Sequence, residues 1–301
     1  MQQFSVFIRQ NTTICNFSSE SWVILSPIEQ NIKAKIEAVG TPLKDWDINI
    51  YRGVLTGYNE AFIIDGETKE KLITEDPKSA EIIRPILRGR DIKRYGYEFA
   101  DLWLINTHNG VKEKGIRPIN IEDYPAVKNH LDKFYPELEK RQDKGITPYN
   151  LRNCAYIEDF SKQKITYIEI MTDNPEDGYD FPCFSFDIES CVVLNTAYIM
   201  TGSIDELKYI LGILNSKLGR LLVKYYVVQL QQRQFRMLNQ YVVNFPIPKI
   251  ENVNSISILV DKIIAFKKQS KSINSLEENI DILVYEMYEF SKEEIQFIEN
   301  Q

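Results

Sequence analysis

The segment CVVLNTAYIMTGSIDELKYILGILNSKLGRLLVKYY, residues 191–226, carries the strongest structural signal in this chain. Its first ten residues are rich in β-branched side chains and predict one long, buried central strand. Ser203 and Glu206 then form a capping box, and leucines and isoleucines recur at helical spacing. The segment therefore predicts a central strand followed by the longest helix, which continues to about Tyr226.

Shorter signals on the N-terminal side predict alternating helices and strands. Ser26, Pro27 and Glu29 predict a helix over 27–39, and a second helix is expected over 122–140, with a kink at Pro136. The runs INIY, EAFIID and LWLI between residues 48 and 105, and KITYIEI from residue 164, predict strands.

The tail, residues 255–301, has the composition of a helical hairpin followed by a short helix capped by Ser291 and Glu294. Together the elements predict an α+β fold, a sheet-rich core flanked by helices with a C-terminal helical hairpin.

Composition favours a folded chain inside the cell. The 301 residues are 44% hydrophobic, no apolar run approaches the roughly 20 residues that span a bilayer, and the N-terminus lacks the order of a signal peptide. We expect a cytoplasmic protein. The four cysteines show no CxxC spacing, and with two histidines they form no zinc pattern, so we expect reduced, mostly buried thiols and no metal site.

The charge is unevenly distributed. The net charge of −7 argues against a chain that coats nucleic acid indiscriminately. Between Glu206 and Glu251, however, there is no acidic residue and several basic ones. Such asymmetry is typical of a basic face on an otherwise acidic protein.

The sequence offers no convincing catalytic motif. Methyltransferases that use S-adenosylmethionine on an exocyclic amine carry a glycine-rich turn and a D/N-P-P-Y/F tetrapeptide, and NFPI at 244–247 lacks the second proline and the aromatic residue. Asp47, followed by Glu67-Thr68-Lys69, matches the sequence motif of a metal-dependent nuclease, a carboxylate and then Glu-x-Lys. Glu67-Thr68-Lys69 leads into EKLITED, however, and a surface helix accounts for these residues equally well. We therefore expect no catalytic residue in this chain.

Three basic clusters are candidates for DNA contact. The first is a glycine-centred segment whose basic residues surround Asp91 and suit phosphate contact: Arg84, Arg88, Arg90, Lys93 and Arg94. Its alternative is a turn whose guanidinium groups pair internally, for instance Arg90 with a buried acid. The second is one side of the long helix, with Lys217, Arg220 and Lys224, for which plain solvated surface is the alternative.

The third cluster, QLQQRQFR at 229–236, mixes glutamine with arginine and contains no acid. Arginine suits guanine edges and glutamine suits adenine edges in the major groove, so we interpret it as a base-reading loop formed by Gln232, Arg233, Gln234 and Arg236. A polar connection without function is the alternative. Backbone contacts are also expected from Asn150, Arg152 and Lys162, with Lys164 as a further candidate.

Several phrases together resemble the TaqI-like C-terminal specificity domain of type IIG restriction-modification enzymes and related adenine methyltransferases. They occur in family order and are YRGVLTGYNEAF (51–62), IIRPILRGRDIKRY (82–95), RQDKGITPYNLRNCAY (141–156), LGILNS (211–216), the two prolines of FPIPK and IDILVYEMYEFSKEEI (280–295). The resemblance implies sequence-specific recognition of double-stranded DNA, while a separate upstream domain binds S-adenosylmethionine and flips the adenine.

The resemblance also implies an organisation. We expect three segments: a connector from an upstream methyltransferase domain over 1–45, a target-recognition domain over 46–250 and the helical hairpin over 251–301. Within the connector, Phe4, Val6 and Ile8 alternate like an edge strand. This chain would then hold no cofactor, and S-adenosylmethionine, with Mg²⁺ if a nuclease is present, would belong to the parent enzyme. The alternatives are a stand-alone specificity subunit that docks on a separate methyltransferase, a protein-interaction module and a complete enzyme with an unrecognised site.

Overall fold

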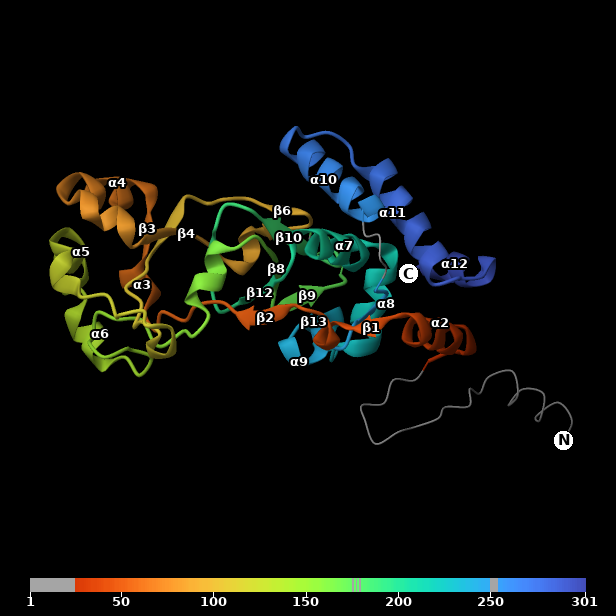
Figure 1. The fold of residues 1–301 in the computed structure, drawn as a ribbon, viewed down its shortest axis with the longest axis horizontal. Helices are drawn as coiled ribbons and strands as arrows, with labels where there is room; N and C mark the ends of the chain where they lie inside the picture. The colour runs from red at the N-terminus through yellow and green to blue at the C-terminus, as the bar shows by residue number, and fades with distance from the viewer. Residues whose placement is uncertain (1–24, 175, 177, 179, 250–253) are drawn as a thin grey trace, which may run out of the picture.

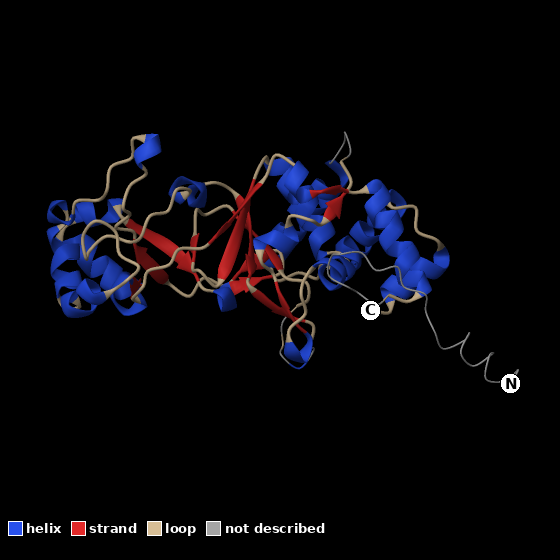
Figure 2. Cartoon of the chain, turned by 90° about the horizontal axis from the view of Figure 1, so that it is seen from below, coloured by secondary structure: helices blue, strands red, loops and turns tan. Residues whose placement is uncertain are grey.

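Strands fill the middle of an elongated molecule, and helices form both of its ends (Figures 1 and 2). The computed structural model describes residues 25–174, 176, 178, 180–249 and 254–301. The helices are α2 (Pro27–Val39), α3 (Asn59–Phe62), α4 (Gly66–Glu75), α5 (Pro125–Asp132), α6 (Tyr135–Lys140), α7 (Ile204–Asn215), α8 (Lys217–Tyr226), α9 (Asn239–Val242), α10 (Asn254–Lys268), α11 (Asn274–Met287) and α12 (Lys292–Glu299).

The strands form two four-stranded sheets and three small pairs. The central sheet has the order β10 (Phe184–Asp187), β8 (Lys164–Ile168), β12 (Ala197–Thr201) and β2 (Asn49–Arg52), all antiparallel. The second has the order β11 (Val192–Val193), β4 (Ile83–Leu87), β7 (Leu102–Ile105) and β3 (Ile63–Asp65), with β11 parallel to β4. The pairs are β1 (Thr41–Pro42) with β14 (Pro246–Ile247), β5 (Ile92–Lys93) with β6 (Gly96–Tyr97), and β9 (Ile170–Thr172) with β13 (Gln234–Arg236). The predicted α+β fold is confirmed.

The single long strand predicted over 191–200 is wrong, because the chain changes sheets there. β11 belongs to the second sheet and β12 to the central one, and a turn joins them in which the N–H of Ala197 donates to the carbonyl of Leu194 at 2.8 Å. Gly53 packs directly against this turn, since a Cβ built on it would lie 2.1 Å from the carbonyl oxygen of Leu194. Hydrophobicity is the same on both sides of the turn, so it gave no sign of the break.

The single long helix was also a wrong prediction, because it breaks at Ser216 into α7 and α8. The buried amide of Asn215 accepts from the main-chain N–H of Phe184 at 3.0 Å and donates to its carbonyl at 2.9 Å. The N–H of Lys217, at the first position of α8, donates to the buried carboxylate of Asp281 at 2.8 Å. Both helices face the same core, so the apolar periodicity continues across the break.

The other predicted helices are confirmed, but the capping box expected at Ser203 and Glu206 is not formed, since the Ser203 hydroxyl donates to the Glu206 carboxylate instead of accepting from the main chain. In α2, Ser26 and Glu29 form the capping box, with 2.6 Å between Ser26 Oγ and Glu29 Oε2. The helix expected over 122–140 is interrupted just before Pro136, giving α5 and α6. The tail forms α10 and α11 followed by α12, whose capping box joins Ser291 and Glu294.

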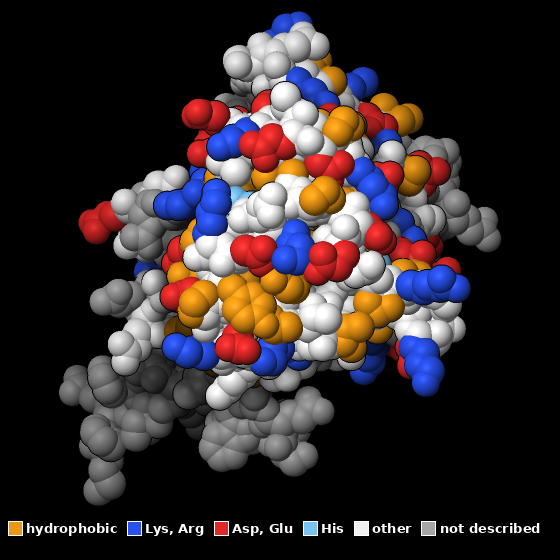
Figure 3. Space-filling model, turned by 90° about the vertical axis from the view of Figure 1, so that its left-hand side faces the viewer, with side chains coloured by type: hydrophobic (Ala, Val, Ile, Leu, Met, Phe, Trp, Pro, Cys, Tyr) orange, Lys and Arg blue, Asp and Glu red, His pale blue; other side chains and the backbone are white. Residues whose placement is uncertain are grey.

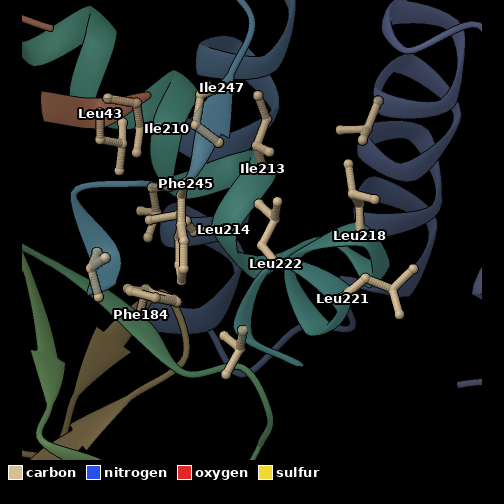
Figure 4. Packing of buried hydrophobic residues seen from close by; sticks show 14 of the residues in the cluster. Leu43, Phe184, Ile210, Ile213, Leu214, Leu218, Leu221, Leu222, Phe245 and Ile247 are labelled. Carbon is tan, nitrogen blue, oxygen red and sulfur yellow. The ribbon is translucent and has the colours of Figure 1, made fainter. Parts of the chain in front are cut away.

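Two hydrophobic clusters hold the elements together. The larger lies between the central sheet, α7, α8 and the C-terminal helices, and Figure 4 shows Phe245 beside Leu214 with Phe184 near the end of its strand. It includes Leu25, Ile165 and Ile298, one from each of the three proposed segments. The smaller joins the second sheet to α4 and α5. The segment boundaries remain predictions, and residues 1–21 lie outside the described residues.

The described cysteines are free thiols, as predicted: Cys183 and Cys191 are buried and Cys154 is partly buried. Burial raises the pKa of Cys183 and Cys191 to about 12, so both are protonated at neutral pH. In the described part of the chain, no helix is long and apolar enough to cross a membrane.

Candidate nucleic-acid interface

The glutamine-rich segment forms a β-hairpin. Residues 228–230 run antiparallel to β13, with Leu230 N–H donating to Gln234 O at 2.7 Å and Arg236 N–H donating to Val228 O at 3.1 Å. The turn between them is Gln231–Arg233, which contains Gln232 and holds Arg233 at φ +61°. On its other side β13 pairs with β9, placing Gln234 opposite Thr172 and Arg236 opposite Ile170. We call residues 170–172, 228–230 and 234–236 the three-strand ribbon.

The ribbon has one buried face and one accessible face. Met171 and Phe235, opposite each other in the centre, are 1% and 3% exposed and pack into the larger cluster. Because side chains alternate along a strand, Gln234 and Arg236 point the other way, together with Ile170 and Thr172. The accessible face therefore presents a glutamine and an arginine side by side.

A groove of about 530 Å³ lies beside this face. It brings together three segments that are distant in the sequence: Arg52 from β2, Arg90 from the basic segment and Gln234 from the ribbon. Its other lining residues are Gly89, Ile168, Glu169, Ile170, Thr172 and Thr196. The first and third basic clusters of the sequence thus meet at one site.

Two buried carboxylates hold the cations of this surface. Glu169 accepts from Arg52 at 2.6 Å and from Arg236 at 3.1 Å, and its side chain is 11% exposed while both arginines are 49% exposed. Asp173 accepts from Arg233 at 2.8 Å and lies 3.4 Å from the ammonium of Lys224. The carboxylates are buried below the surface and the guanidinium groups lie at the surface. The ion pairs therefore orient the arginines while the outer edges of their guanidinium groups stay accessible to solvent.

Arg90 differs from its neighbours in the basic segment. It is exposed, lies in the short 3₁₀ turn Gly89–Asp91 and forms no ion pair with any residue that the structure describes. Asp91 instead pairs with Arg88, at 2.7 and 3.0 Å. The buried acid that the alternative interpretation assigned to Arg90 therefore pairs with Arg88.

The remaining cations of the segment are engaged elsewhere. Arg84 donates to the main-chain oxygens of Ala80, Ile83 and Glu81. Arg94 pairs with Glu277 of α11 at 2.6 Å, and Lys93 lies 3.8 Å from Glu98. Arg84, Arg88 and Arg94 therefore form hydrogen bonds or ion pairs within the protein, which is the alternative to phosphate contact that the sequence left open.

The basic side of α8 is covered by the end of the chain. Lys217 pairs with Glu299, Arg220 donates to the main-chain oxygen of Gln301 at 2.6 Å, and Lys224 reaches the side chain of Gln301 at 3.5 Å. These cations are therefore paired within the protein, with the Lys217 side chain still 41% exposed, and their contact with DNA remains a prediction. The sequence could not show that α12 packs there.

The candidates between residues 150 and 164 lie apart from the groove. Asn150 is buried and donates to the carbonyl of Ile119 at 2.9 Å. Arg152 and Lys162 are exposed and pair with Asp143 and Asp159 at 3.1 and 2.6 Å. Lys164 is fully buried against Asp187. Their DNA contacts remain predictions.

Sequence analysis missed most of the groove residues, among them Arg52, Glu169 and Ile170. Arg52 stands within the YRG phrase, which was interpreted as a family motif only. Glu169 and Ile170 follow a buried strand, and nothing in their own sequence shows that β13 pairs there.

Other surfaces lack this combination of groups. A cavity of about 680 Å³ is lined by residues that include Tyr97, Phe99, Trp103, three lysines and three acidic residues. Positive and negative charges are therefore balanced in it. Acidic and basic side chains are interspersed at the α4–α6 end of the molecule (Figure 3). Among the described residues, no three His, Cys, Asp or Glu side chains are grouped to hold a metal.

Comparison with known proteins identifies the class. Residues 84–247 match the model of the TaqI-like C-terminal specificity domain. This match spans more than half of the chain, and the chain therefore belongs to that family.

Two solved structures are similar in fold. The type IIL restriction-modification enzyme MmeI, solved in complex with DNA, matches 87% of this chain with a TM-score of 0.60 and 14% identity, over 37% of its own length. The type IIG restriction endonuclease BpuSI matches 87% with a TM-score of 0.49 and 12% identity, over 33% of its own length. This chain thus spans about a third of the length of either structure.

Proposed function

We propose that this chain reads the base sequence of double-stranded DNA for a restriction-modification adenine methyltransferase, and that the three-strand ribbon and its groove are the reading site. One observation carries the proposal: Arg52, Arg90 and Gln234, from three distant segments, line the same groove, and Arg236 pairs with Glu169, which also lines it. A β-ribbon fits the major groove of B-DNA, where arginine and glutamine match the edges of guanine and adenine.

The parent activity follows from the family as part of this proposal. S-adenosylmethionine and the target adenine belong to a methyltransferase domain outside this chain, because the sequence contains neither the glycine-rich turn nor the tetrapeptide that would hold them. Any Mg²⁺ would belong to a nuclease domain of the parent enzyme. A cytoplasmic location and an upstream methyltransferase domain as partner belong to the same proposal. The chain alone transfers no methyl group to DNA.

The test is selection of duplexes from a randomised library by the purified chain, followed by competition between the enriched sequence and a scrambled one. Arg90→Ala should weaken binding of the enriched duplex, whereas Arg117→Ala, which alters an exposed arginine outside the groove, should not. Absence of any enriched sequence at about 50 mM salt, where phosphate contacts are strong, would reject the proposal. Incorporation of labelled methyl groups by the pure chain would reject its non-catalytic part.

A further inference from the structure

The accessible face of the ribbon carries apolar side chains in a regular arrangement. The bridge between Gln229 and Phe235 sets Val228 opposite Arg236 and Leu230 opposite Gln234. Directly opposite residues of antiparallel strands share a face, so Val228 and Leu230 lie on the same face as the two polar residues. Val228 is 40% exposed and Leu230 39% exposed.

The third strand completes the pattern. Ile170, opposite Arg236 on β9, is 39% exposed, and Thr172, opposite Gln234, is 9% exposed and also lines the groove. Across the ribbon one row is therefore Val228, Arg236 and Ile170. The next row is Leu230, Gln234 and Thr172, so each planar hydrogen-bonding group lies between two side chains that carry methyl groups.

This arrangement limits what can bind. Phosphate contact would favour cations or hydroxyl groups in the flanking positions, and half-exposed aliphatic side chains there gain nothing from a phosphate. On the major-groove edges of B-DNA the apolar feature is the C5-methyl group of thymine, while adenine presents N6 and N7 to a glutamine. Leu230 beside Gln234, and Ile170 diagonal to it, thus match an adenine edge beside thymine methyl groups.

We propose that the ribbon selects A·T base pairs by contact with the thymine methyl group, with Leu230 and Ile170 as the methyl-contacting residues and Gln234 as the adenine reader. This inference rests on the proposed function and adds the chemical identity of part of the recognised site. It concerns base pairs that stay stacked in the duplex, and not the adenine that the methyltransferase domain flips out.

Uracil interference tests the inference on whichever duplex the chain enriches. That duplex is prepared with uracil at random in place of some thymines, which removes only the C5-methyl group, and the chain is used to separate bound from free DNA. Cleavage at uracil then shows which methyl groups matter. We expect uracil at one or more thymines to be depleted from the bound fraction about fourfold, the effect of burying one methyl-sized group.

Two variants assign the contact. Leu230→Ala or Ile170→Ala should remove the discrimination at a particular thymine, and Ile282→Ala, an exposed isoleucine of α11, should keep the wild-type pattern. An enriched sequence that is indifferent to uracil at every thymine would overturn the inference and leave the proposed function intact. No enriched sequence at all would instead reject the proposed function.

Discussion

Glu169 shows how a single buried residue can set the geometry of the proposed reading surface. Its carboxylate holds the guanidinium groups of Arg52 and Arg236 from below. A bidentate contact to a base requires a guanidinium group fixed in direction, and an ion pair on its inner edge supplies that constraint. Glu169 is therefore a positioning residue of the proposed site.

We predict that Glu169→Gln separates affinity from selectivity. Removing one negative charge should leave or increase binding to scrambled DNA, because phosphates are repelled less. Preference for the enriched sequence should fall about tenfold, since one bidentate contact discriminates by roughly 1–3 kcal/mol. Competition binding measures both quantities, and Glu277→Gln, which removes a carboxylate outside the groove, is the control. Equal losses on both duplexes would argue against a positioning role.

Arg88 differs from Arg52 and Arg236, because its guanidinium group is used in an ion pair that stabilises the fold. Its guanidinium group and main-chain N–H both bind Asp91, which is 5% exposed. Burial raises the pKa of Asp91, but the bonds from Arg88 outweigh it and leave the pKa below its usual value. The carboxylate is therefore stabilised in the folded state.

Arg88→Ala should lower the free energy of unfolding at pH 7 by about 1–3 kcal/mol, because a buried carboxylate loses its partner. A depressed folded-state pKa gives stability that is present above about pH 4 and is lost as the pH falls, so the difference from wild type should shrink toward pH 3. Urea unfolding at several pH values measures this. A stable variant that binds DNA more weakly on every sequence would instead make Arg88 a phosphate contact.

At the scale of elements, the break between α7 and α8 depends on a carboxylate supplied by another helix. Asp281 of α11 accepts from the N–H of Lys217 and is 5% exposed. Burial raises its pKa to about 6, against the lowering effect of the Lys217 N–H. Its charged form is thus costly in the fold although its hydrogen bond is needed.

Asp281→Asn should stabilise the protein at neutral pH, because the amide oxygen can still accept from Lys217 without a buried charge. A raised folded-state pKa gives stability that is present below about pH 4 and lost as the pH rises to 6. The gain of the variant over wild type should grow across that window, by about 1–3 kcal/mol. Asp261→Asn, at an exposed pair with Lys208, is the control. A difference independent of pH would contradict the role given to Asp281.

The same elements show what could be predicted from the sequence. Local signals gave α2, the break before Pro136 and the three C-terminal helices, because caps, proline and apolar spacing act within a few residues. The break at Ser216 depends on Phe184 and Asp281, which are distant in the sequence. The pairing of β9 with β13, and with it the place of Glu169 in the site, likewise depends on a long-range register.

At the scale of the whole molecule, the proposed reading site is a small cationic surface on an acidic protein. The net charge of −7 opposes approach to DNA, and the cations of α8 are paired with the C-terminal end of the chain. The phosphate contacts that remain are few, so the isolated chain should bind duplex DNA weakly.

The salt dependence of binding tests which cations face the DNA. The logarithm of the association constant should fall linearly with the logarithm of salt concentration, with a slope of about −0.9 for each phosphate neutralised. Arg90→Ala removes an exposed cation of the groove and should make the slope shallower by about one unit. Arg220→Ala removes a cation held by Phe181 and Gln301, and it should lower the melting temperature while leaving the slope unchanged. If Arg220→Ala made the slope shallower and Arg90→Ala did not, the DNA would lie over α8, and the three-strand ribbon would lose its assignment as the reading site.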